Sequence, residues 1–222
     1  MATVVVVAPH PDDETLGCGG TLLRHKRNGD DVHWLIVTHV SEASGYSLER
    51  VQTRNQEIER VAARYAFDST TNLQFAPASL DRIPMGELVN RISFVFRELH
   101  PEIVYLPYAG DAHTDHSFVS DAVLACTKWF RYPEVRRVLA YETLSETDFG
   151  IRPDRNGFRP NVFVDISEFL DDKIEVMKIY QSELGSFPFP RSEEAIFSLA
   201  KVRGAASGFK AAEAFMLLRE SV

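Results

Sequence analysis

Segments rich in β-branched residues alternate along the chain with segments in which apolar residues recur every three or four positions. The first, TVVVVA at 3–8, is continuously apolar, as is typical of a parallel strand covered on both faces. Residues 47–65 instead carry charged side chains between apolar positions at helical spacing. The same pattern along the chain predicts strands at 3–8, 32–37, 72–75, 102–107, 136–142, 161–166 and 212–221, and helices at 14–29, 47–65, 85–99, 116–130 and 167–184.

Particular residues mark one end of each of two of these helices. Gly29 stands at the end of the first helix, where glycine commonly terminates a helix, and Ser167 precedes the last helix as an expected N-cap. The first helix also contains GCGG at 17–20, which is not the GxGxxG fingerprint of dinucleotide-binding proteins. We therefore expect these glycines to mark close helix–sheet packing or backbone approach to a site.

Strands that alternate with helices over 222 residues predict one α/β domain spanning 1–222. The expected architecture is a Rossmann-like, doubly wound, mostly parallel sheet with helices on both faces. Ligands of such sheets bind beyond the carboxyl ends of the strands, near the point where the strand order reverses. Two polar clusters follow strand ends, HPDD at 10–13 and GDAHTDH at 110–116, and we expect them to meet at one crevice.

Composition and charge narrow the class of protein. The chain has 32 acidic and 24 basic residues, a formal net charge of −8, which argues against general nucleic-acid binding because that affinity comes from neutralising phosphates. No apolar run approaches the ~20 residues that span a bilayer, and the N-terminus lacks the basic region of a signal peptide. Cys18 and Cys126 form no CxxC pair, so both are expected to be packed, reduced thiols. We expect a cytoplasmic protein without nucleic-acid or membrane partners, and the sequence is compatible with a homo-oligomer.

The two polar clusters contain a set of metal-binding residue types. His10 and Asp13, three residues apart after a strand, can face one point, and His116 can supply a third ligand. Two imidazoles and one carboxylate leave coordination positions open for water, which is the mark of a catalytic metal site. We expect one Zn²⁺ per chain, and Fe²⁺ stays open because the same ligands suit it.

The residues beside these ligands suggest roles in acid–base chemistry. Asp12 adjoins a ligand and is expected to be the general base that activates water. His113 precedes His116 by one helical turn; protonated beside Asp115, it would stabilise an oxyanion or donate a proton to a leaving group. The alternative for the adjacent aspartates is that they cap the following helix.

A separate group of arginines follows the fifth predicted strand. Arg152, Arg155 and Arg159 lie in RPDRNGFRP at 152–160. We expect a solvated loop, and the alternative is a rim that grips a phosphate group of the substrate, because arginine binds phosphate with two parallel hydrogen bonds.

HPDDE at 10–14 and HTDH at 113–116 together resemble the PIG-L / LmbE-like N-acetylglucosaminyl deacetylase family. RNQE at 54–57, VDIS at 164–167 and AEAF at 212–215 are also similar to it, so the resemblance runs through most of the chain. It implies a Rossmann-like fold and zinc-dependent hydrolysis of an N-acyl group, usually the acetyl group of an amino sugar. By motif position it implies these roles: His10, Asp13 and His116 as zinc ligands, Asp12 as base, His113 and Asp115 for the oxyanion and leaving group, and Arg54 for holding substrate or acetate.

The sequence therefore predicts a zinc-dependent amidohydrolase that releases acetate and a free amine from an N-acetyl amino sugar or its conjugate. His39 stands where relatives often have a small or acidic residue, a difference that concerns the substrate rather than the chemistry. Two alternatives stay open at this point. One keeps the metal but changes the reaction, to a phosphoesterase or an Fe(II) oxygenase, and the other is a non-catalytic sugar-binding domain.

Overall fold

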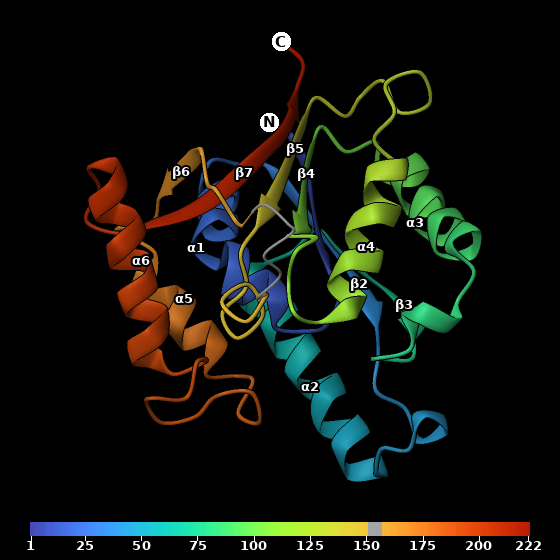
Figure 1. Cartoon of the computed structure of the whole chain (residues 1–222), viewed down its shortest axis with the longest axis horizontal. Helices are drawn as coiled ribbons and strands as arrows, with labels where there is room; N and C mark the ends of the chain where they lie inside the picture. Colours follow the sequence, from blue (N-terminus) through green and yellow to red (C-terminus); the bar gives the residue numbers. More distant parts are fainter. Residues whose placement is uncertain (151–156) are drawn as a thin grey trace.

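The computed structural model describes residues 1–150 and 157–222, and within them a seven-stranded sheet is flanked by helices (Figure 1). The strands are β1 (Thr3–Ala8), β2 (Asp31–Thr38), β3 (Ser69–Phe75), β4 (Ile103–Pro107), β5 (Arg137–Tyr141), β6 (Val162–Asp165) and β7 (Ala212–Glu220). The helices are α1 (Asp13–Arg27), α2 (Leu48–Tyr65), α3 (Met85–Leu99), α4 (Thr114–Ala125), α5 (Leu170–Met177) and α6 (Glu193–Ser207), with short 3₁₀ turns at Glu42–Ser44 and Leu80–Arg82.

The sheet has the strand order β3-β2-β1-β4-β5-β7-β6. Strands β1 to β5 run parallel to one another, and β7 is antiparallel to both β5 and β6. The chain moves outward from β1 through β2 to β3 and then returns to place β4 on the other side of β1. The strand order therefore reverses between β1 and β4, so the ends of these two strands form the expected ligand crevice.

Each face of the sheet is buried beneath helices, which confirms the predicted doubly wound α/β architecture. Alternate residues of β1 separate the two cores: Val5 and Val7 pack with α3 and α4, whereas Val4 and Val6 pack with α1, α2, α5 and α6. Figure 1 shows α3 and α4 on one side of the sheet and α1, α5 and α6 on the other. All four of these valines have no exposed surface, as expected for a central strand of a parallel sheet.

Close packing explains the predicted glycines of α1. A Cβ atom on Gly17 would lie 2.3 Å from the Tyr141 ring, and one on Gly20 would lie 2.6 Å from Ile166. Helix α1 therefore sits against β5 and the segment after β6 at a distance that only glycine permits. The helix ends at Arg27, and Gly29 follows with a φ of 80°, which suits glycine.

A buried ion pair crosses the middle of α1. Glu213 of β7 accepts hydrogen bonds from the Gly20 and Thr21 N–H groups, at 2.9 and 2.7 Å. Lys173 of α5 donates to the Leu16 carbonyl at 2.8 Å and to Glu213 at 2.7 Å. In a regular helix the Gly20 N–H and the Leu16 carbonyl pair with each other. The C-terminal part of the chain thus fixes the helix whose first residue is Asp13.

Two predicted helices differ from the structure at their ends. The helix predicted at 116–130 ends at Ala125, where the Thr127 hydroxyl donates to the Leu124 carbonyl at 3.0 Å. Ser167 is not an N-cap: its hydroxyl donates to the Asp165 carboxylate at 2.5 Å, and α5 begins only after Phe169.

The chain after α5 also departs from the prediction. Helix α5 ends at Met177 rather than near residue 184, and the buried Tyr180 then donates to the Glu14 carboxylate at 2.9 Å, which draws the chain inward. Helix α6 was not predicted from the apolar pattern. Its first turn is capped by Ser192, whose hydroxyl accepts the Ala195 N–H at 3.1 Å.

Candidate active site

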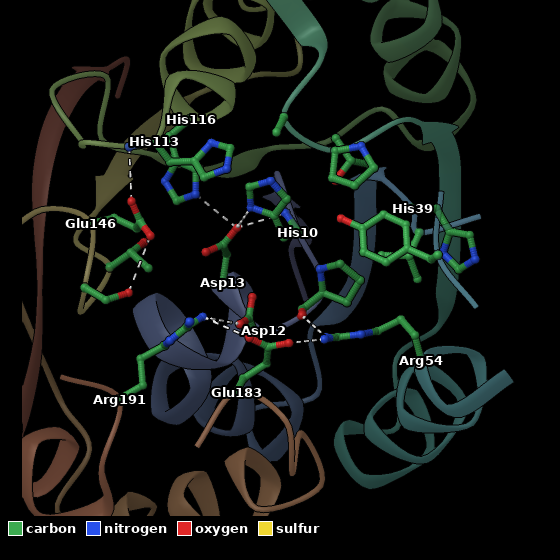
Figure 2. Close-up of a pocket in the computed structure, with 18 of the residues that line it drawn as sticks. His10, Asp12, Asp13, His39, Arg54, His113, His116, Glu146, Glu183 and Arg191 are labelled. Carbon is green, nitrogen blue, oxygen red and sulfur yellow. Dashed lines mark hydrogen bonds and ion pairs between the residues drawn. The ribbon is translucent and has the colours of Figure 1, made fainter. Parts of the chain in front are cut away.

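The two predicted clusters lie side by side at the carboxyl ends of β1 and β4. His10 and Asp12 are in the turn between β1 and α1, and Asp13 is the first residue of α1. His113 is the N-cap residue of α4, and His116 lies in the first turn of that helix. Figure 2 shows these side chains converging on one pocket. Their meeting point follows from the pairing of β1 with β4.

Three donor atoms converge at the centre of the site. The Oδ2 atom of Asp13 lies 3.3 Å from His10 Nδ1 and 3.3 Å from His116 Nε2. Asp13 is 3% exposed and His116 is fully buried. Zinc bonds of 2.0–2.1 Å at tetrahedral angles separate neighbouring ligand atoms by about 3.3 Å, so these spacings suit a zinc ion.

The outward nitrogens of both histidines contact carboxylates. His10 Nε2 lies 3.1 Å from Asp115 Oδ2, and His116 Nδ1 lies 2.8 Å from Asp111 Oδ2. Metal-binding histidines typically have such a partner, which fixes the tautomer and the orientation of the ring. Asp111 was not predicted from the sequence, although it lies within the GDAHTDH segment.

The inward nitrogen of His116 supports the presence of a metal ion. His116 Nε2 is buried and makes no hydrogen bond within the described part of the chain. It forms an ion pair with Asp13 Oδ2 at 3.3 Å, and a metal ion at the point that both atoms face would satisfy this buried nitrogen. His10, Asp13 and His116 thus fit a bound divalent metal in both residue type and spacing.

Asp12 has an unusual backbone conformation. Its φ is 138°, a value that is strained for a residue with a side chain, and its carboxylate makes no hydrogen bond to cap α1. The helix-cap alternative is therefore wrong for Asp12. Its Oδ2 atom instead accepts a hydrogen bond from the Nη1 atom of Arg191 at 3.1 Å.

The two neighbouring aspartates have opposite electrostatic environments. Burial raises the pKa of Asp12 well above its usual value, and the Asp13 and Glu183 carboxylates add to this effect while Arg191 opposes it. Burial also acts on Asp13, but the contacts with His116 and His10 outweigh it and lower the pKa of that carboxyl. The site thus keeps Asp13 as a charged donor between two imidazoles.

His113 lies at the edge of the site with one nitrogen already occupied. Its Nδ1 atom accepts the Asp115 N–H at 3.1 Å, so a neutral ring carries its proton on Nε2. Burial and the nearby His10 lower the pKa of His113 to about 4. The contact with the Asp115 N–H favours a neutral ring that donates through Nε2, and the role of His113 at an oxyanion or leaving group stays a prediction. The Asp115 carboxylate is 4.0 Å from His113 and closer to His10.

Arg54 reaches the site from α2 and is 5% exposed. It donates from Nη1 to the Pro11 carbonyl at 2.7 Å, pairs through Nη2 with Glu183, and lies 3.2 Å from Glu57 through Nε. Arg54 therefore holds the HPDD turn through the Pro11 carbonyl, and it also lines the pocket.

The pocket has a volume of about 260 Å³, and six of the seven predicted site residues line it, with Asp115 behind His10. His39, Tyr46, Arg50, Ser145 and Glu146 also line the pocket, and Figure 2 shows His39 and Glu146 on opposite sides of it.

Two further residues of the site come from the loop between α5 and α6. Glu183 and Arg191 line the pocket, and neither was predicted as a site residue. The signal that could have found them is weak, since they follow no strand and belong to no motif. Of the predicted arginine loop, Arg152 and Arg155 lie outside the described residues, and Arg159 is exposed.

The chain is similar to known deacetylases. It is 28% identical over 228 residues to the diacetylchitobiose deacetylase of Thermococcus kodakarensis, covering 95% of this chain and 80% of the relative. It is 24% identical over 197 residues to the probable N-acetyl-alpha-D-glucosaminyl L-malate deacetylase 2 of Bacillus anthracis, covering 82% of each chain. Among solved structures, the conserved protein TT1542 from Thermus thermophilus aligns with a TM-score of 0.80 at 28% identity, covering 100% of this chain and 97% of that one.

The family described as GlcNAc-PI de-N-acetylase matches residues 5–127, which is more than half of the chain. This segment contains most of β1, all of β2 to β4, the three candidate metal ligands, Asp12 and His113. The resemblance noted in the sequence motifs is thereby confirmed, and the chain belongs to the PIG-L family.

Proposed function

We propose that this protein is a zinc-dependent N-deacetylase that hydrolyses the acetamide of an N-acetyl amino sugar, or of its conjugate, to a free amine and acetate. The observation that carries the proposal is the convergence of His10, Asp13 and His116 beside the buried carboxylate of Asp12. Relatives named as deacetylases of diacetylchitobiose and of an N-acetylglucosaminyl malate support the substrate class.

A zinc ion bound by the three donors would lower the pKa of a coordinated water and polarise the acetyl carbonyl. Asp12 accepts the proton of the attacking water through its carboxylate, which lies at the floor of the pocket and is 4% exposed. Asp115 and Asp111 hold the rings of His10 and His116 in place. Asp115 thus acts on the site chiefly through His10.

His113 donates a hydrogen bond from Nε2 to the oxygen that gains charge as the carbonyl carbon becomes tetrahedral. A donor fixed in this way costs no reorganisation during the reaction, and its backbone is held because the His113 N–H donates to Glu146 at 3.1 Å. The proton taken by Asp12 is then available for the departing amine. The products are acetate and an amine.

We also propose that residues 1–222 act as one catalytic domain. Glu183 and Arg191, which follow the matched segment 5–127, line the same pocket as His10 and Asp13. Strand β7 extends the sheet beside β5, and its Glu213 accepts hydrogen bonds from α1. No helix in the described part of the chain is long and apolar enough to cross a bilayer. The expected partner is a small N-acetylated sugar.

Amine release from a panel of N-acetyl sugars tests the proposal. The panel contains N-acetylglucosamine, diacetylchitobiose and an N-acetylglucosaminyl malate, and acetate is measured in parallel. We expect equal amounts of amine and acetate, about one zinc ion per chain and loss of activity on chelation. Full activity of metal-free protein would contradict the mechanism. Phosphate release or oxygen consumption would favour the other metal-dependent reactions, and sugar binding without turnover would favour a binding domain.

A further inference from the structure

The loop between α5 and α6 brings two charged side chains to the site. Glu183 and Arg191 come from this loop, and Figure 2 shows both beside Asp12 and on the opposite side of it from His10. Both residues follow the segment 5–127 that matches the family. The metal donors therefore come from the first part of the chain, whereas the partner of Asp12 comes from the last third.

Arg191 joins two carboxylates. Its Nη1 atom lies 3.1 Å from Asp12 Oδ2 and 3.2 Å from Glu183 Oε2. Glu183 in turn pairs through Oε1 with Arg50 at 2.8 Å and with Arg54. Oε1 of Glu183 thus faces two arginines of α2, and Oε2 faces Arg191. This arrangement ties the Arg191 guanidinium to the rest of the fold.

Asp12 needs a partner that fixes the orientation of its carboxylate. Its backbone is strained, its carboxylate does not cap α1, and the Asp13 carboxylate beside it is of like charge. The hydrogen bond from Arg191 takes the Oδ2 atom and so sets the rotation of the carboxylate. The Oδ1 atom is then the oxygen that is left to accept a proton.

We propose that Arg191 is a positioning residue for Asp12 and that Glu183 holds Arg191 in place; this inference rests on the proposed deacetylase function. Arg191 acts through the carboxylate of Asp12 rather than by binding the metal or the sugar. A misplacement of about 1 Å in a reacting group can cost about 10²-fold in rate, so the expected effect of removing the guanidinium is of that order.

Kinetics of Arg191→Met separate positioning from substrate binding. We expect kcat to fall about 10–10²-fold with KM and zinc content within about twofold of the wild type. Arg191→Lys should recover part of the rate, because an ammonium group can still reach a carboxylate. Arg64→Met is the matched control, since Arg64 forms an exposed pair with Asp172 away from the pocket.

A double-mutant cycle tests whether Arg191 acts through Asp12. Arg191→Met should add little to the loss caused by Asp12→Asn, because the group that it positions is already inactive. Fully multiplicative losses would overturn the proposal. A raised KM at unchanged kcat would make Arg191 a substrate-binding residue, and loss of zinc would make it a structural support of the metal site.

Crystal structures of the zinc-loaded wild type and Arg191→Met give a readout that needs no turnover. We expect one orientation of the Asp12 carboxylate in the wild type. In the variant we expect a rotated carboxylate or two alternative conformations. Glu183→Gln, which keeps the size of the side chain, should show a smaller change in the same direction. An unmoved Asp12 in Arg191→Met would overturn the inference even if every sugar of the panel were turned over. A moved Asp12 without turnover of any sugar would instead count against the proposed function alone.

Discussion

Asp12 and Asp13 are adjacent in the chain, but their carboxylates face different partners. Asp13 Oδ2 lies 3.3 Å from both metal-facing histidine nitrogens, whereas Asp12 Oδ2 lies 3.1 Å from Arg191. The two side chains point apart because Asp13 begins α1 while Asp12 has a φ of 138°. Two residues of the same type thus make different contacts, which is the basis for the separate roles that we propose for them.

Asp13→Ala is expected to release the metal. The substitution removes the donor that lies between His10 and His116, and the two imidazoles alone form a much weaker site. Zinc content after dialysis, measured by elemental analysis, should fall well below one per chain, and activity should fall with it. Retention of zinc would show that Asp13 is not a ligand.

Asp12→Asn is expected to keep the metal and lose turnover. The amide has nearly the same size as the carboxylate but accepts no proton, and general-base catalysis typically contributes ~10²–10⁴-fold. The loss should appear in kcat, with zinc content unchanged. Near-normal turnover would remove Asp12 from the mechanism, and a loss of zinc would make it a ligand.

Asp111→Asn tests the support behind His116. The Asp111 carboxylate lies 2.8 Å from His116 Nδ1 and also accepts the Thr147 hydroxyl at 2.6 Å. Loss of such an outer partner typically weakens metal binding about 10–100-fold. Competition against a chelator of known affinity measures the change. Asp121→Asn, on the exposed side of α4, is the matched control, and an equal effect of both variants would count against the assignment.

His113→Ala, which removes the Nε2 donor, tests the proposed stabilisation of the oxyanion. Removing one such donor typically costs ~10²–10³-fold in kcat, and the metal should remain because His113 is not one of the three donors. Steady-state kinetics and zinc analysis of the same preparation check both parts. An unchanged kcat would show that the charge on the oxygen is stabilised without His113.

Asp30→Asn tests a stabilising contact far from the metal. Asp30 accepts the Ala2 N–H at 2.8 Å and contacts His25 Nδ1 at 2.7 Å; burial opposes these contacts, but together they lower its pKa. Because the folded pKa is depressed, the stabilisation is present above the unfolded value of about 3.9 and is lost as the pH falls through the folded value. We expect a loss of about 1–2 kcal/mol at pH 7, measured by urea unfolding, that shrinks toward pH 3. A constant difference across this range would contradict the assignment.

The central part of the site was predictable because its residues follow apolar strands directly. His10 and Asp13 come just after a run of valines, and the cluster that holds His116 comes just after the fourth strand. Parallel strands bring their carboxyl ends to one edge, so sequence position alone predicted that the clusters would meet. The sequence therefore predicted correctly that these residues lie together, and their roles as metal ligands, base and oxyanion donor stay predictions.

The remaining part of the site was not predictable in this way. Arg191 meets Asp12 only because the loop after α5 folds inward, and no periodic pattern describes a loop. Helix α6 was missed because small and charged residues dilute its apolar stripe, although Ser192 and Gly208 mark its two ends. Asp115 contacts His10 more closely than His113, and this choice depends on side-chain packing, which the sequence does not specify.

The pairing of β1 with β4 also has a consequence for how the protein matures. The donors Asp13 and His116 are about a hundred residues apart in the chain, so bringing them together requires closure of a long loop. A chain that has been synthesised only as far as the HPDD turn contains His10 and Asp13 but not His116, so its site is incomplete. Binding of the proposed metal by all three donors would therefore follow the docking of β4. A bound ion would then link the first and middle parts of the polypeptide and resist their separation during partial unfolding.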